Sequence, residues 1–179
     1  MMNKILVSAL LIIISCGKTE KIVLETEPKD PIHKTLVDQN ESQAARIWLE
    51  KSIKNYFNGN LGGLNHTMEE ITTKEYYEYK TDATNVDMDV DGSLTEKEFH
   101  EKWKNQFNTK KAGIGVGFLI SGQDWNKIEI SKCRLISKGK NNFLFDVKLT
   151  DREYEAEYPI QVKVVKVKNQ FFIADVLQD

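Results

Sequence analysis

Twelve residues in the middle of the chain place oxygen ligands at a regular spacing. Asp87, Asp89 and Asp91 alternate along the chain, and a fourth carboxylate follows at Glu98. A hard cation such as Ca²⁺ is held by about seven oxygen atoms, and alternating carboxylates can supply several of them from one side. Four carboxylates crowded into so short a segment would repel one another without a cation. The spacing therefore predicts a calcium site.

This segment resembles the EF-hand calcium loop at every diagnostic position. Gly92 occupies the sixth position, where the EF-hand loop turns sharply, and Leu94 occupies the eighth, which anchors the loop to a core. The resemblance implies that Ser93 offers its backbone carbonyl and that Thr95 binds directly or through a water molecule. The implied metal ligands are Asp87, Asp89, Asp91, Ser93, Thr95 and Glu98.

The residues on both sides of the loop predict two helices. Thr72-x-x-Glu75 is typical of a capping box, and the apolar face that follows it is Tyr79, Ala83 and Val86. Thr95-x-x-Glu98 is a second capping box, followed by apolar residues at Phe99, Trp103 and Phe107. The turn-and-cap pattern alone also occurs without metal, because Asp and Gly favour turns and Thr favours helix starts. That reading leaves the three alternating aspartates unexplained.

EF-hands usually occur in pairs, and we find no second intact loop in the sequence. The nearest candidate, residues 58–69, lacks acidic residues at its first, third and fifth positions. A lone loop inserted in another domain favours a structural clip over a calcium sensor of the paired type.

The N-terminus carries a second informative pattern. Residues 1–15 contain one Lys followed by an apolar run that is too short to span a bilayer, which predicts a secretory signal. The run ends in Ile13-Ile14-Ser15-Cys16, which resembles the lipobox of bacterial lipoproteins. This resemblance implies cleavage before Cys16, acylation of its thiol and a location in the bacterial cell envelope, periplasmic or surface-facing. An ordinary signal peptide with an incidental cysteine is the alternative.

Length and composition limit the remaining possibilities. The chain has 179 residues, a net charge of -2 and a pI near 6.0, which favours one domain and gives no basis for nucleic-acid binding. Residues 16–40 carry two of the three prolines and no sustained period, so they predict a flexible tether before a domain at residues 41–179. With Cys16 acylated, Cys133 has no partner, and a small buried hydrophobe is its expected role.

Residues 41–179 predict an α+β fold. A helix is expected after a cap at Asn40, and beyond the two loop helices the hydrophobic period changes from that of helices to that of strands. We expect a curved antiparallel sheet of about four to five strands, the first of them at residues 114–120 with a face of glycines. This order resembles the nuclear-transport-factor-like cone fold, which often forms a ligand pocket.

The sequence thus predicts a lipid-anchored envelope protein that binds one calcium ion. Its expected partners are a membrane, through the lipid at Cys16, and the ion itself. A small-molecule pocket protein and a protein-interaction module are the alternatives. We do not expect an enzyme, because His33, His66 and His100 are scattered and none lies in a nucleophile or metal motif.

Overall fold

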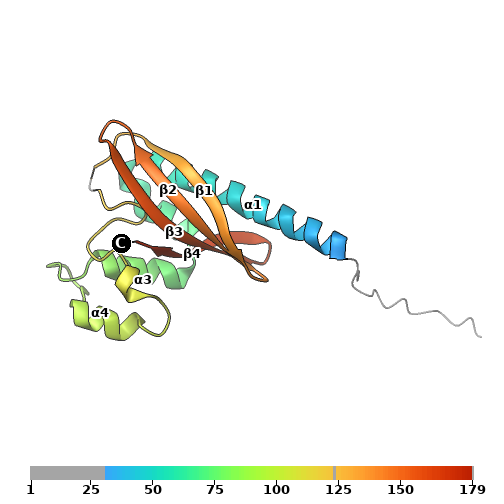
Figure 1. Ribbon diagram of the computed structural model, residues 1–179. Helices are drawn as coiled ribbons and strands as arrows, with labels where there is room; N and C mark the ends of the chain where they lie inside the picture. The colour runs from blue at the N-terminus through green and yellow to red at the C-terminus, as the bar shows by residue number, and fades with distance from the viewer. Residues whose placement is uncertain (1–30, 123, 179) are drawn as a thin grey trace, which may run out of the picture.

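The computed structural model describes residues 31–122 and 124–178, and it confirms the α+β class. Helices come first and a curved antiparallel sheet follows (Figure 1). The helices are α1 (Pro31–Asn58), α2 (Leu64–Ile71), α3 (Lys74–Thr84) and α4 (Glu96–Trp103), with 3₁₀ turns at Leu61–Gly63 and Thr109–Lys111. The strands are β1 (Ile128–Lys138), β2 (Asn142–Asp151), β3 (Ala156–Val167) and β4 (Gln170–Leu177).

The four strands form one sheet in the order β1-β2-β3-β4, and each strand pairs antiparallel with the next. Strict alternation along β2 buries Phe143, Phe145, Val147 and Leu149 completely. Strand β1 has register shifts against β2 between Ile130 and Lys132 and between Leu135 and Ser137. Such shifts bend a strand and increase its twist, which agrees with the curvature of the sheet.

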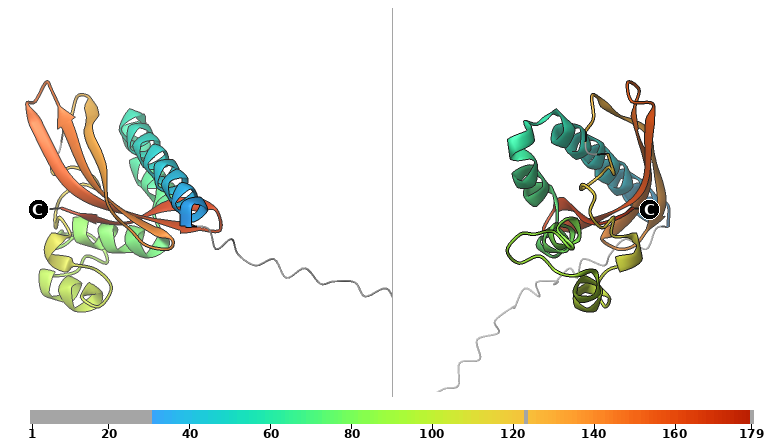
Figure 2. Two further views of the ribbon diagram at one scale, coloured as in Figure 1. Left: turned by 45° about the vertical axis from the view of Figure 1, so that its right-hand side comes forward. Right: turned by 90° about the vertical axis from the view of Figure 1, so that its left-hand side faces the viewer.

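Helices α1, α2 and α3 pack against the curved sheet, whereas α4 packs against α3 (Figure 2). Helix α1 buries one stripe against it, formed by Ala45, Leu49, Ile53 and Tyr56 at helical spacing. Helix α3 lies beside β4, and the Thr73 N–H donates to the Ile173 carbonyl at 2.8 Å where the helix begins. No helix in residues 31–122 or 124–178 is long and apolar enough to cross a membrane.

Two helix starts differ from the prediction. Helix α1 begins at Pro31, so residues 31–40, expected to belong to the tether, are helical. Helix α3 is capped by Thr73, whose hydroxyl accepts from the Tyr76 N–H, whereas the predicted cap, Thr72, donates to the Met68 carbonyl. Thr72 has Glu75 at the spacing of a capping box, but the helix begins one residue later than that pattern predicts, at Lys74.

The glycine-faced strand expected at residues 114–120 is absent, and this prediction was wrong. The chain there forms turns, with Gly113 and Gly115 at φ of 59° and 70°. These are left-handed conformations that glycine adopts without strain, and a strand cannot contain them. Alternation of glycine with apolar residues here reflects tight turns over the core, where Phe118, Leu119 and Ile120 are buried.

Asp151, buried at the end of β2, organises the loops at one end of the sheet. Its Oδ2 accepts from the Asn126 and Lys127 N–H groups at 2.7 and 3.2 Å. Its Oδ1 accepts from the Glu153 and Tyr154 N–H groups at 3.0 and 3.3 Å. Burial acts to raise the pKa of this carboxyl, but the four N–H groups outweigh it and hold the pKa below its ordinary value.

We predict that Asp151→Asn lowers the melting temperature by several degrees at neutral pH, because an amide NH₂ would then face backbone donors. A folded-state pKa below the ordinary one stabilises the protein at neutral pH, and this stabilisation is lost as the pH falls through the folded-state value. The difference between wild type and variant should therefore shrink on acidification, measured by thermal unfolding. Asp124→Asn, at an exposed position in the adjoining loop, is the matched control. Equal effects of the two substitutions would contradict the role of Asp151.

Candidate metal centre

The predicted calcium loop lies between two helices, as expected. Helix α3 ends at Thr84 with Asn85 as its C-cap, and α4 starts at Glu96 with Thr95 as its N-cap. The residues between them form turns and bends at the end of the molecule where α4 lies (Figure 1). The helix–loop–helix arrangement that the sequence predicts is therefore present.

Aromatic side chains hold the two helices together behind the loop. The Tyr79 ring of α3 stacks on Phe99 of α4, with ring centroids 5.4 Å apart, and on Phe107 at 4.2 Å. Trp103 contacts the Tyr79 ring edge-on at 5.6 Å. All three apolar residues predicted for the second helix therefore contact the first. Leu94, at the eighth loop position, packs against this core.

A polar contact that the sequence analysis missed joins the same two helices. Asp82 Oδ2 accepts from the Lys102 ammonium and from the Trp103 indole N–H, both at 2.7 Å. Without Asp82 the indole N–H would be buried without a partner. The hydrogen bond to Asp82 therefore fixes Trp103 against α3. Twenty residues separate these groups, and no local pattern predicts such a contact.

The backbone of the loop turns at the glycine that the EF-hand pattern requires. Gly92 has φ of 83°, a left-handed conformation, and an exposed position. The Asp87 N–H donates to the Leu94 carbonyl at 2.9 Å, and the Ser93 N–H to the Val90 carbonyl at 3.1 Å. The Ser93 hydroxyl donates to the Asn85 carbonyl at 2.5 Å. These bonds close the loop on itself between its first and eighth positions.

The predicted ligands share this loop, but the structure does not bring their side chains to one point. Asp87, Asp89 and Asp91 are all exposed. Within residues 31–122 and 124–178, no three acidic, histidine or cysteine side chains gather closely enough to hold a metal ion. The oxygen-rich donor set suits a hard cation such as Ca²⁺. The residues therefore fit the ion by chemistry, although their carboxylates are spread along the loop.

Glu98, the expected closing ligand, is occupied by the helix start. Its Oε2 accepts from the Thr95 N–H at 2.9 Å and from the Thr95 hydroxyl at 2.7 Å. The Thr95 hydroxyl in turn accepts from the Glu98 N–H, so the predicted capping box is confirmed. The backbone and side-chain bonds from Thr95 lower the pKa of Glu98, which stays ionised. Thr95 and Glu98 thus hold each other.

Lys80, one turn before the end of α3, is a fully buried lysine. Its ammonium donates to the Ala112 and Gly113 carbonyls at 2.8 and 3.0 Å and to Gln178 Oε1 at 2.6 Å. The three donors of an ammonium thus meet three acceptors. Removal from water lowers the pKa of Lys80 to about 7. Sequence analysis did not single out this residue, because lysines on an amphipathic helix are usually exposed.

Comparison of the chain with known protein families, with curated proteins and with solved structures finds no match. Two resemblances therefore stay predictions. They are that of residues 41–179 to the nuclear-transport-factor-like fold and that of residues 87–98 to the EF-hand loop. The signal sequence, Cys16 and residues 17–30 of the expected tether lie outside the described residues.

We predict that the free energy of unfolding rises between pH 7 and pH 10 because of Lys80. Its pKa is about 7 in the folded protein against an ordinary 10.5, so over this range the unfolded chain binds one more proton than the folded protein. One proton contributes about 1.4 kcal/mol per pH unit. Lys80→Met should remove this part of the rise, measured by urea unfolding at a series of pH values.

The matched control for this test is Lys74→Met, at the exposed start of the same helix. It should leave the pH dependence of stability unchanged. The assignment to Lys80 fails if Lys80→Met and wild type show parallel curves of stability against pH.

Proposed function

We propose that this protein binds one calcium ion through the loop Asp87–Glu98 and is held at a bacterial membrane by a lipid on Cys16. One observation carries the calcium proposal. Three exposed, alternating aspartates precede a left-handed Gly92 in a loop that joins two helices packed on one aromatic core. A turn without a metal function needs the glycine and the cap, but not the aspartates.

The ligand roles follow from the donor types. Asp87, Asp89 and Asp91 would supply carboxylate oxygens, and Ser93 its backbone carbonyl. Glu98 and Thr95 would also contribute oxygens, and there the ion competes with the capping box that the two residues form. Loss of a helix cap costs about 1 kcal/mol. If Glu98 has to leave the cap to bind the ion, the favourable free energy of calcium binding is smaller by that amount.

The substitution Glu98→Gln tests metal binding separately from helix capping. Glu98→Gln keeps a side chain that can complete a capping box but removes the carboxylate charge. We expect the wild-type chain to gain melting temperature on addition of millimolar calcium, and Glu98→Gln to lose most of this gain. Calcium at 100 times its dissociation constant would stabilise the fold by about 2.7 kcal/mol. Calorimetric titration of the metal-stripped full chain gives the stoichiometry, expected to be one.

Glu101→Gln is the matched control, because Glu101 is an exposed acid on the same helix, paired with Lys104 at 2.6 Å. It should keep the calcium response of wild type. Glu98 is not a ligand if Glu98→Gln responds like Glu101→Gln. The calcium proposal as a whole fails if the wild-type chain binds no calcium at millimolar concentration.

The lipid anchor is tested with the two cysteines of the chain. In a bacterial host we expect the wild-type protein in the membrane fraction, labelled by an alkyne analogue of palmitate. Cys16→Ser should abolish both the label and the membrane association. Cys133→Ser, within β1, should change neither. Membrane association that survives in Cys16→Ser would refute the anchor.

A further inference from the structure

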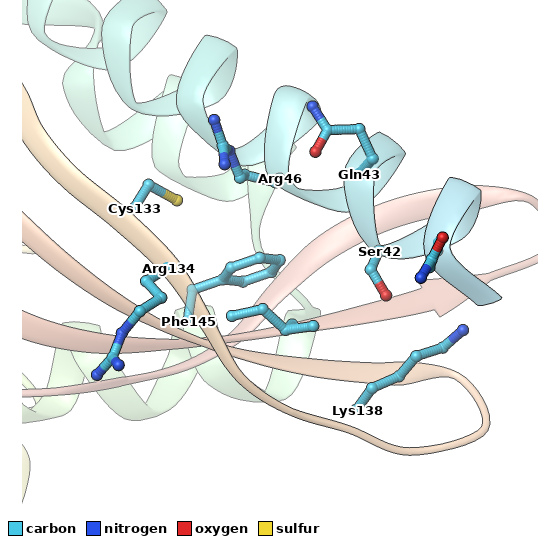
Figure 3. A pocket seen from close by; sticks show the side chains of 9 residues that line it. Ser42, Gln43, Arg46, Cys133, Arg134, Lys138 and Phe145 are labelled. Carbon is cyan, nitrogen blue, oxygen red and sulfur yellow. The ribbon is translucent and has the colours of Figure 1, made fainter. Parts of the chain in front are cut away.

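A groove of about 580 Å³ runs between α1 and β1 (Figure 3). Its volume lies within the range of small-molecule sites, which are mostly apolar with a few placed polar groups. No residue of the calcium loop or of its flanking helices lines it. The groove is thus a second feature of the molecule, separate from the calcium proposal.

The floor of the groove is apolar. Phe145 is fully buried beneath it, Leu135 is 37% exposed, and Cys133 is half-buried beside them. Burial raises the pKa of the Cys133 thiol to about 12, with the nearby Glu50 carboxylate acting in the same direction. The thiol therefore stays neutral and belongs to the apolar surface. An alkyl chain or ring laid on this floor would cover apolar area that water now contacts.

Cationic side chains reach into the groove from both walls. Figure 3 shows Arg46 extending from α1 towards Cys133, and Lys138 extending from β1 towards the start of α1. Arg134 also lines the groove, but its guanidinium points away from α1. This agrees with the pleat of β1, in which residues 133 and 135 face α1 and residue 134 faces the other side.

Glu50 engages only part of the Arg46 guanidinium. In the part of the chain that the structure describes, Arg46 donates from Nε alone, to Glu50 at 3.0 Å. The two Nη groups are left for a ligand. Lys138 already pairs with Glu41 at 3.4 Å, and the same carboxylate holds Lys166 at 2.9 Å. Arg46 is therefore the residue that can offer donors to a ligand here.

We propose that the groove binds a small amphiphilic carboxylate, with its apolar part on Leu135 and Cys133 and its carboxylate paired with the Nη groups of Arg46. A guanidinium and a carboxylate can form two parallel hydrogen bonds, which fixes the head group. Glu50 opposes any anion there, so the affinity depends on the apolar contacts as well. An added peptide strand is less suited to β1, because register shifts at Ile130/Lys132 and Leu135/Ser137 interrupt its edge.

Decanoate is a suitable probe, titrated calorimetrically into the full chain below its micelle concentration. We expect saturable binding of one molecule, unaffected by calcium. Arg46→Gln should raise the Kd at least tenfold. Arg134→Gln, which removes an equal charge from the outer face of the sheet, should change the Kd less than twofold. Decyltrimethylammonium, with the same tail and the opposite charge, should not bind.

Alkylation of Cys133 locates the ligand independently of charge. Mass spectrometry of the Cys133 peptide should show slower reaction with N-ethylmaleimide in the presence of decanoate. The proposal is overturned by equal Kd changes in the two arginine variants, by binding of the cationic amphiphile as tightly as decanoate, by unprotected Cys133, or by no decanoate binding. Because these readouts need no calcium, their failure leaves the calcium proposal untouched.

Discussion

Burial of the Lys80 ammonium constrains this structure more than any other single interaction that we identify. An ammonium removed from water needs an acceptor for each of its donors, and Lys80 finds them on two segments far from it in sequence. Those segments are the turn at Ala112 and Gly113 and the residue that follows β4, Gln178. The helix, the turn and the last strand can therefore reach their positions only together.

The residues packed around Lys80 leave little free space, as this constraint requires. A Cβ atom at Gly113 would lie 2.6 Å from Gln178 Oε1 and 2.7 Å from Val116 Cγ2, so only glycine allows the carbonyl to approach. Gln178 in turn donates through Nε2 to the Gly117 carbonyl at 3.2 Å. Its backbone N–H donates to the Lys111 carbonyl, which pairs Ala112 with Gln178 in a single parallel bridge just after β4. Gly113 therefore serves close approach, whereas Gly115, with nothing within 4 Å of a Cβ atom, serves the left-handed turn.

Patterns with a short repeat could be predicted from the sequence, whereas contacts between distant residues could not. The change to a strand period after the helices, the spacing of Phe99 and Trp103 in α4 and the Thr95–Glu98 capping box each involve a few neighbouring residues, and the structure confirms them. Gly113 and Gly115 were misassigned because a period of two does not distinguish a strand from successive turns. Lys80 with Gln178, and Asp82 with Trp103, depend on how the elements meet. In the candidate site, the two flanking helices and the turn at Gly92 could be predicted, but the competing use of Glu98 depends on where the helix starts.

The contacts that hold α3 and α4 together bear on what calcium could do here. The Tyr79 stack and the Asp82 bridge to Lys102 and Trp103 involve none of the six proposed ligands. The helix pair therefore does not depend on the ion for its association. If the loop binds calcium, the binding energy acts on the loop and on the first turn of α4, where Glu98 exchanges Thr95 for the metal. Such an ion clips a local segment to an existing scaffold, and large rearrangement of the domain is not expected from it.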